Sequence, residues 1–347
     1  MTAEPAVVIG RPFPIVEAAA LEVLGDLDEP ALVVANDPPW SAIADRLPRL
    51  PAKLILAGSM ELAHLQALAA VPDNGRVVVG VGGGTALDTA KYLAWSTSRP
   101  LIQIPTITSV DAGFTDAVGV RVDGRVRYVG HMEPRIVVLD IGLIRSAPPH
   151  LNRAGIGDIL SCHSALWDWR AAAAVGKGPA WRADLAHLAA SLLAELDAAA
   201  ADVRAVTPAA VRWLADAYAR VGAAGAAAGH SRFEEGSEHF VAYAYEHATG
   251  ARHIHGELVA FAVAAVAHAQ DNDPGWVLDV VGRCGTRAHP LDLDIGIDVF
   301  GPIFVSLRGY ARAEDLDVGL ADVRDLTDAD ADAAWRFAAQ LPRVAIS

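Results

Sequence analysis

The sequence predicts an α/β fold in its first half and an all-helical second half. From Ala6 to about Asp140, short apolar strand patterns alternate with helical patterns, which is typical of a parallel sheet with helices on both faces. After Pro148-Pro149 most segments have helical character. The chain of 347 residues also exceeds what one hydrophobic core usually serves. We therefore expect two domains, residues 1–148 and residues 149–347.

The strands of the first domain are predicted from short apolar runs. They lie at Val7–Ile9, Ala31–Ala35, Lys53–Ala57, Arg76–Val79, Leu101–Ile104 and Ile136–Leu139. Helices are expected between the early strands, at Pro14–Leu24, Trp40–Leu47 and Ala63–Ala70. Asp123-Gly124 is typical of a type I′ turn, so Val118–Val122 and Arg125–Tyr128 are predicted to form a β-hairpin.

The helices of the second domain are predicted from periodicity and from capping residues. They lie at Asp158–Arg170, Ala180–Val203, Pro208–Ala228, Glu238–His247, Gly256–Gln270 and Asp328–Leu341. Thr207 precedes Pro208 as an N-cap, and proline suits the first helical position. Thr327 with Asp330 three residues later is an aspartate variant of the capping box.

The composition argues against several classes of partner. A formal net charge of −14 disfavours nucleic acid or an anionic membrane as the main partner. The two cysteines, Cys162 and Cys284, form no disulfide framework and fit a reducing cytoplasm. We see no signal peptide, and the longest apolar stretch, Leu258–Ala267, is too short to cross a bilayer. We expect a cytoplasmic homo-oligomer that acts on a small molecule.

The stretch Val77–Lys91, VVVGVGGGTALDTAK, is the strongest local signal. A valine-rich strand, three glycines and a helix start describe a loop in which backbone N–H groups approach a pyrophosphate. Gly82-Gly83-Gly84 lacks the GxGxxG spacing, and no Walker-type lysine follows. A purely structural strand-to-helix turn is the alternative, but it would need only one or two glycines.

Asp37 is a second candidate for nucleotide contact. It follows the strand Ala31–Ala35 at the end where ligands bind in open parallel sheets, so it is placed to meet an adenosine ribose, which would favour NAD over NADP. The same residue in Asn36-Asp37-Pro38-Pro39 is at least as typical of an ordinary turn.

Three short stretches of the second domain carry metal-binding residue types at predicted helix starts. Asp158 ends Ala154–Asp158, His239 ends Gly236–His239, and His255 lies in His253–Glu257. One carboxylate and two imidazoles with an open fourth position make a catalytic zinc site. The histidines are 16 residues apart, the length of a helix, a turn and the next helix start. A single histidine is nevertheless more often a surface or core residue than a ligand.

Five motifs follow one another in a recognisable order. They are GVGGGTALDTAK, PTITSVDAG at Pro105–Gly113, AGIGD at Ala154–Asp158, SEH at Ser237–His239 and HGELVAF at His255–Phe261. The sequence thereby resembles the family of glycerol dehydrogenase and glycerol-1-phosphate dehydrogenase, within the iron-type alcohol dehydrogenases and dehydroquinate synthases. The resemblance covers about Val77–Phe261. It implies a Rossmann-like N-terminal domain, a helical C-terminal domain, NAD(P) in the cleft and a divalent metal beside the nicotinamide.

The resemblance also implies roles for individual residues. For the cofactor these are the pyrophosphate loop Gly82, Gly83, Gly84 and Thr85, the aspartate Asp88 of the GGGxxxD pattern, and Thr106, Thr108 and Ser109 on the nicotinamide side. Asp111 matches the aspartate that touches substrate hydroxyls, although a turn carboxylate after Ser109-Val110 is the alternative. Asp158, His239 and His255 match the metal ligands, so that these three and Asp111 are the expected catalytic residues.

The identity of the metal follows from the same resemblance. The iron-binding branch has a fourth ligand, a histidine, one helical turn after the aspartate, where this chain has Cys162. Glycerol-type members use three ligands and zinc, so we expect Zn²⁺ on three protein ligands. Fe²⁺ or another divalent cation is the alternative, and Cys162 is a minor candidate ligand. His253 and His247 are the rival imidazoles.

The expected reaction interconverts a polyol or polyol phosphate, of the glycerol-1-phosphate type, and its ketone with NAD(P). SEH favours the glycerol-phosphate branch, but Tyr243 replaces a second histidine of that branch, and Thr106–Ala112 leans toward glycerol dehydrogenase. The alternative is a dehydroquinate synthase-like sugar phosphate cyclase that oxidises its substrate only transiently. That group uses Glu where this chain has Asp158, and several lysines, whereas no lysine lies between Lys91 and Lys177. A catalytically silent scaffold would predict a broken site.

Overall fold

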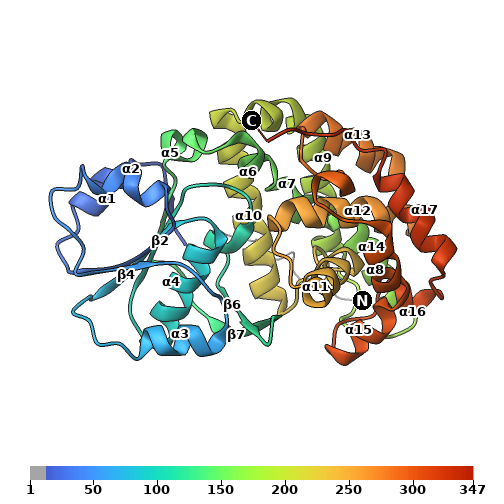
Figure 1. Cartoon of the computed structure of the whole chain (residues 1–347), viewed down its shortest axis with the longest axis horizontal. Coiled ribbons are helices and arrows are strands. Elements are labelled where there is room, and N and C mark those ends of the chain that lie inside the picture. Colours follow the sequence, from blue (N-terminus) through green and yellow to red (C-terminus); the bar gives the residue numbers. More distant parts are fainter. Residues whose placement is uncertain (1–12, 347) are drawn as a thin grey trace, which may run out of the picture. The chain divides into compact units, whose positions relative to one another are not determined.

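The computed structural model describes residues 13–346, with the elements labelled in Figure 1. The predicted strand Val7–Ile9 lies outside the described residues. The chain separates into two compact units by its internal contacts. The first unit contains Arg11–Asn152, of which residues 13–152 are described, and Thr207–Gly222; the second contains Arg153–Val206 and the chain from Ala223 onward.

The first unit is built on a six-stranded sheet in the order β1-β8-β5-β4-β2-β3. Its strands are β1 (Ile15–Val16), β2 (Ala31–Ala35), β3 (Lys53–Leu56), β4 (Val77–Gly82), β5 (Leu101–Pro105) and β8 (Ile136–Val138). Every pairing in this sheet is parallel, as the alternation of strands and helices predicts. The carboxyl ends of β2, β4 and β5 are therefore neighbours at one edge of the sheet.

Short helices and one hairpin complete the first unit. The helices are α1 (Ala20–Gly25), α2 (Pro39–Ala44), α3 (Leu62–Ala69), α4 (Gly84–Ser96), η1 (Asp111–Gly113), α5 (Ile141–Ser146) and α6 (Pro149–Arg153), whose last residue belongs to the second unit. The hairpin pairs β6 (Ala117–Val122) with β7 (Arg125–His131). Asp123 and Gly124 both have positive φ, as the predicted type I′ turn requires.

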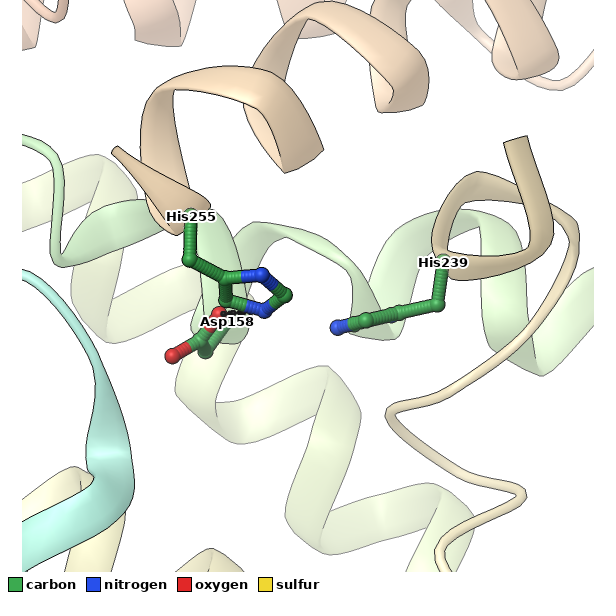
Figure 2. Close-up of side chains that lie close together, drawn as sticks. All are labelled: Asp158, His239 and His255. Atoms are coloured by element: carbon green, nitrogen blue, oxygen red, sulfur yellow. Dashed lines mark ion pairs between the residues drawn. The ribbon is translucent and has the colours of Figure 1, made fainter. Parts of the chain in front are cut away.

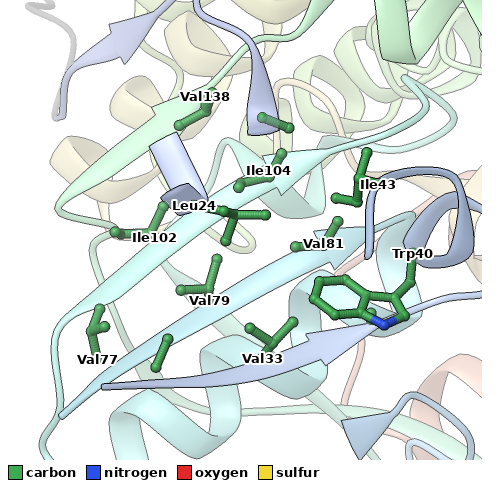
Figure 3. Close-up of a cluster of buried hydrophobic side chains, with 13 residues drawn as sticks. Leu24, Val33, Trp40, Ile43, Val77, Val79, Val81, Ile102, Ile104 and Val138 are labelled. Carbon is green, nitrogen blue, oxygen red and sulfur yellow. The ribbon is translucent and has the colours of Figure 1, made fainter. Parts of the chain in front are cut away.

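Both faces of the sheet are buried, which explains why its strands are almost continuously apolar. Figure 3 shows one face, where the odd-numbered valines of β4 lie with Trp40 and Leu24. On the other face, Val78 of β4 packs with Leu65 of α3 and with residues of α4 and β6. The period of two along β4 thus divides its side chains between two cores.

In the described residues of the second unit, every regular element is a helix. Its helices are α7 (Ile156–Leu160), α8 (Cys162–Ala174), α9 (Ala183–Ala205), α11 (Ser237–Thr249), α12 (His255–Gln270), α13 (Pro274–Cys284), η2 (Pro290–Asp292), α14 (Ile297–Val305), α15 (Leu307–Ala313), α16 (Leu320–Val323) and α17 (Asp328–Ala338). Helix α12 is buried almost all round and packs against α7, α8, α11, α13, α16 and α17. Between residues 13 and 346, no helix is both long and apolar enough to cross a membrane.

Helix α10 (Pro208–Ala228) has residues in both units, and its bounds are those predicted. Thr207 caps it by accepting the N–H of Ala210, 3.2 Å away. The segment Thr207–Gly222 groups with the first unit, and one of its contacts there is the Tyr218 hydroxyl, which donates to the Thr108 carbonyl oxygen at 2.9 Å. The predicted division at residue 148 is based on a local change in sequence character. The structure instead groups residues 149–152 and 207–222 with the sheet, and this grouping depends on long-range contacts.

Two predicted helices differ from the structure. In Pro14–Leu24, Ile15 and Val16 instead form the edge strand β1, because they pair with Val137 and Val138 of β8, and the helix begins only at Ala20. The helix predicted at Asp158–Arg170 is interrupted at Ser161, between α7 and α8. There the Ser161 hydroxyl donates to the Asp158 carbonyl oxygen at 2.9 Å, a local bond that competes with helical pairing.

The sheet core sets the stability of the first unit. We expect Ile104→Ala to lower the free energy of unfolding by about 2–5 kcal/mol, because Ile104 is fully buried in β5 and its removal leaves a cavity. Leu56→Ala is the matched control, since Leu56 on the edge strand β3 is 54% exposed. Denaturant unfolding measures both variants, and equal losses would contradict this assignment of the core.

Candidate metal centre and nucleotide loop

Asp158, His239 and His255 come together in the second unit (Figure 2). One potential ligand atom of each residue lies within 4.8 Å of those of the other two. Asp158 Oδ1 is 3.3 Å from His255 Nε2, and the His239 and His255 ring centroids are 5.4 Å apart. Three side chains from α7, α11 and α12, separated by up to 97 residues (255 − 158), therefore face one point.

A close approach of α7 and α12 brings Asp158 and His255 together. Gly157 and Gly256 meet at this contact: a Cβ on Gly157 would lie 2.4 Å from the Gly256 carbonyl oxygen and 2.6 Å from its Cα. No real Cβ tolerates such distances to a backbone, so glycine is required at position 157. Asp158 follows one of these glycines and His255 precedes the other, which fixes the distance between the two side chains.

The N-terminus of α11 is anchored before His239. The Asp168 carboxylate of α8 accepts the Ser237 N–H at 2.6 Å, and the Ser237 hydroxyl accepts the Leu320 N–H at 2.9 Å. A Cβ on Gly236 would lie 2.8 Å from Asp168 Oδ2 and 2.9 Å from the Ala165 Cα. The Gly236-Ser237 step of the motif thus serves close packing and anchoring.

The surroundings of His239 favour positive charge. Its burial is the largest single effect and by itself lowers the imidazole pKa, but the hydrogen bond from Nδ1 to Glu238 and the nearby negative charges together outweigh it. The charges of Glu238, Glu235 and Asp158 act in the same direction, and the pKa of His239 rises to about 9. In the metal-free protein both ring nitrogens of His239 therefore carry a proton at neutral pH. A metal ion that binds one of these nitrogens must displace its proton.

The donor set fits a divalent metal. A carboxylate and two imidazoles are the donors of catalytic zinc sites, and three protein ligands leave a position for substrate. Within residues 13–346 this is the only group of three or more such residues close enough to hold an ion.

Cys162 and the rival histidines lie outside this group. Burial raises the pKa of the Cys162 thiol well above its usual value, and the charges of Glu234 and Glu238 raise it further. The thiol is therefore protonated and is a poor ligand. His253 Nε2 lies 3.0 Å from the Leu293 carbonyl oxygen, and the His247 ring lies 6.0 Å from that of Tyr310.

The three glycines of the predicted phosphate loop lie at the carboxyl end of β4 and the start of α4. Gly82 has φ +156°, a conformation that favours glycine. A Cβ on Gly83 would lie 2.7 Å from Ile107 Cδ1, and one on Gly84 would lie 2.9 Å from Val110 Cγ1. Packing by itself therefore explains each glycine, and the phosphate role stays a prediction. Thr85 lies exposed in the first turn of α4.

Asn36 contacts the glycine loop, and the sequence did not indicate this contact. Its side-chain oxygen accepts the Gly83 N–H at 3.0 Å, and its own N–H donates to the Val81 carbonyl oxygen at 3.1 Å. It follows β2, which neighbours β4 in the sheet. Asn36 thereby holds the loop, and only the strand order reveals it.

The loop after β5 carries the predicted nicotinamide-side residues. The Thr106 hydroxyl is buried without a hydrogen-bond partner, and its N–H donates to the Gly82 carbonyl oxygen at 2.9 Å. Thr108 is held instead by the protein, because its N–H donates to Asn152 Oδ1 at 2.9 Å. Ser109 is buried, and Asp111 begins the short helix η1. Nothing in the local sequence indicated the Asn152 contact.

Asp88 and Asp37 both have partners within the first unit. Asp88 lies 3.4 Å from the ammonium of Lys91, which is 1% exposed and donates to the Ala117 carbonyl oxygen at 2.9 Å. Asp37 Oδ1 accepts the Ser41 hydroxyl at 2.6 Å and the Ser41 N–H at 3.2 Å. Asp37 therefore hydrogen-bonds within the first turn of α2, and its contact with a nucleotide stays a prediction.

Comparison with known proteins identifies the family. Residues 48–148 match the family of iron-containing alcohol dehydrogenases. The glycerol-1-phosphate dehydrogenase [NAD(P)+] of Pyrobaculum neutrophilum is 33% identical over 232 residues, which are 64% of this chain and 68% of that protein. The chain therefore belongs to the glycerol-1-phosphate dehydrogenase family, within the wider group of iron-containing alcohol dehydrogenases.

Two further relatives define the extent of the match. The glycerol-1-phosphate dehydrogenase [NAD(P)+] of Methanothrix thermoacetophila is 28% identical over 64% of this chain and 62% of its own length. The chain thus spans less than two thirds of several curated relatives. A probable glycerol dehydrogenase from Sinorhizobium meliloti has the same fold, with a TM-score of 0.71 and 21% identity over 95% of this chain and 97% of that one.

The α7–α12 contact generates a testable prediction. Gly157→Ala forces the two backbones apart, so we expect weaker Zn²⁺ binding and a loss of about 1–3 kcal/mol in unfolding free energy. Gly309→Ala is the matched control, because a Cβ there meets nothing within 4 Å. Equilibrium zinc titration and denaturant unfolding measure both effects. Wild-type zinc affinity in Gly157→Ala would argue against the role of this contact.

The buried Asp168 generates a prediction about pH. Burial, and next the charge of Glu238, raise its pKa from 3.8 to about 6 despite the nearby Arg232. The raised pKa means that protonated Asp168 stabilises the fold: its contribution is complete below about pH 4 and is lost as the pH rises through 6.

The prediction for Asp168 is tested by measuring the free energy of unfolding between pH 4 and pH 7, because this range includes the raised pKa. Relative to Asp168→Asn, the wild-type protein is expected to lose up to about 3 kcal/mol over that range. A constant difference between the two proteins would show that Asp168 does not titrate there.

Proposed function

We propose that this protein is an NAD(P)-dependent, divalent-metal-dependent dehydrogenase that interconverts a polyol or polyol phosphate and its ketone. The substrate class is glycerol-1-phosphate and dihydroxyacetone phosphate or a close analogue, in keeping with the names of its relatives. The observation that carries the proposal is the approach of Asp158, His239 and His255 within 4.8 Å. This geometry supports an intact site, in contrast to a silent scaffold.

Asp158, His239 and His255 are the proposed metal ligands. A divalent cation held there would supply Lewis acidity, which lowers the pKa of a substrate hydroxyl. We propose Zn²⁺, since carboxylate and imidazole donors with three protein ligands suit catalytic zinc, and Fe²⁺ is the alternative. The carboxylate and the two rings would hold the cation, and three protein ligands would leave a position for substrate oxygens.

The first unit is the proposed NAD(P)-binding domain. NAD(P), when bound, accepts the hydride from the substrate carbon. The proposed contacts are Gly82, Gly83, Gly84, Thr85, Asp88, Thr106, Thr108, Ser109 and Asp37. The buried Thr106 hydroxyl supports this, because such groups rarely lack a hydrogen-bond partner. Asp111 is proposed to orient the second substrate hydroxyl, and the protein is proposed to be a cytoplasmic homo-oligomer.

Replacement of one ligand tests the proposed reaction. We expect Asp158→Asn to lower bound zinc and NAD(P)H production from glycerol-1-phosphate by at least about 100-fold, since it removes the only anionic ligand. Metal analysis and absorbance of the reduced nicotinamide are the measurements. Asp325→Asn is the control, because the Asp325 side chain is 87% exposed.

Three outcomes would contradict the proposal. If Asp158→Asn kept its metal and its activity, the ligand assignment would be wrong. Phosphate release from a sugar phosphate without accumulation of reduced nicotinamide would favour the cyclase. No turnover with glycerol, glycerol-1-phosphate or dihydroxyacetone phosphate would exclude the named substrate class.

A further inference from the structure

Glu238 is a fully buried carboxylate beside the candidate ligand His239. Its exposed fraction is 0%, and its Oε1 atom lies 2.9 Å from His239 Nδ1. An ionised carboxylate accepts hydrogen bonds and cannot donate them, so the proton of this contact belongs to Nδ1. In the neutral ring the lone pair is then on Nε2. Figure 2 shows the His239 ring pointing toward Asp158 and His255, where that lone pair is needed.

Other hydrogen bonds hold the Glu238 carboxylate in place. The Gly236 N–H donates to Oε1 at 2.6 Å, and the Ser164 hydroxyl of α8 donates to Oε2 at 2.7 Å. Both carboxylate oxygens are therefore fixed by donors, one from the N-cap residue of α11 and one from α8. The carboxylate cannot rotate away from His239 without leaving a buried donor unsatisfied.

A second buried carboxylate, Asp168, makes it possible to distinguish the effect of orienting the His239 ring from the effect of buried negative charge. Asp168 is also 0% exposed, and it accepts the Ser237 N–H at 2.6 Å and the Gln270 side-chain N–H at 3.0 Å. Neither of these hydrogen bonds reaches a candidate metal ligand. It therefore shares the burial and charge of Glu238 and lacks its contact with His239.

We propose that Glu238 is a positioning residue that fixes the tautomer and ring orientation of His239, so that Nε2 is presented to the metal. This inference rests on the proposed metal-dependent function. Hydrogen-bonded partners of this kind orient the histidines of metal sites and raise their basicity, and their removal typically lowers metal affinity about 10- to 100-fold. The motif Gly236-Ser237-Glu238-His239 then combines close packing, anchoring, orientation and ligation in four consecutive residues.

The test compares Zn²⁺ affinities, measured by competition with a chelator, for the full-length chain. We expect Glu238→Ala to weaken zinc binding about 10- to 100-fold, because Nδ1–H loses its acceptor. Glu238→Gln keeps a neutral acceptor for Nδ1–H, so its loss is expected to be smaller. Asp168→Asn is the matched control: asparagine keeps an oxygen that accepts the Ser237 N–H anchoring α11 and removes only the buried charge, so we expect the affinity of the wild-type protein.

A measurement on the zinc-loaded wild-type protein does not depend on the folding of any variant. Nitrogen-15 NMR of the histidine rings is expected to show His239 protonated at Nδ1 and zinc-bound through Nε2. The reverse tautomer would overturn the proposal.

The zinc affinities distinguish a failure of the proposed role of Glu238 from a failure of the proposed metal-dependent function. Unchanged zinc affinity in Glu238→Ala, with a wild-type protein that binds zinc, would overturn the role of Glu238 and leave the proposed function intact. An equal loss in Asp168→Asn would mean that buried charge and not orientation is responsible, which also overturns it. A wild-type protein that binds no zinc and no Fe²⁺ would instead overturn the proposed metal-dependent function, and the role of Glu238 with it.

Discussion

The close contact between α7 and α12 is the constraint on which the candidate metal centre depends. Gly157 allows α7 to approach the backbone of Gly256 in α12, where a Cβ on residue 157 would collide. Asp158 and His255 are the immediate neighbours of these glycines, so a packing contact also sets the distance between a carboxylate and an imidazole. Because α12 is buried by helices on several sides, this distance is held by the core of the second unit. A site built on packed helices is held more precisely than one on a mobile loop.

Buried charge is the second feature of this region. Asp158, Asp168 and Glu238 are all nearly or fully removed from solvent, in a helical unit that also buries polar side chains such as Ser164, Ser237 and Gln270. Such groups are costly to bury unless defined partners satisfy them. Asp168 and Glu238 accept backbone N–H groups at the start of α11, while Asp158 lies beside His255. The negative surroundings favour a cation, in agreement with the raised pKa of His239.

The glycine loop of the first unit has a packing role that the structure shows and a phosphate role that stays a prediction. Ile107 and Val110 occupy the space where Gly83 and Gly84 would carry side chains, so the protein needs these glycines for its own packing. A helix N-terminus such as the start of α4 also favours an anion, which is the basis of the proposed phosphate role. Packing and ligand binding therefore favour the same residue type, and the triple glycine by itself does not separate them.

The sequence by itself determined the elements whose signals are local. The bounds of β2 and α10 follow from an apolar run and from the cap Thr207-Pro208, and the motifs named the three candidate metal ligands. Tertiary structure decided the edge strand β1, the grouping of 207–222 with the sheet, and the partners Asn152 and Glu238. The Thr108–Asn152 contact spans 44 residues and the Thr108–Tyr218 contact 110, and even the adjacent Glu238 is fixed by Ser164, 74 residues away. The two partners of each of these three hydrogen bonds are too far apart in the sequence for a local pattern to include both. Only the folded chain therefore specifies which donor meets which acceptor.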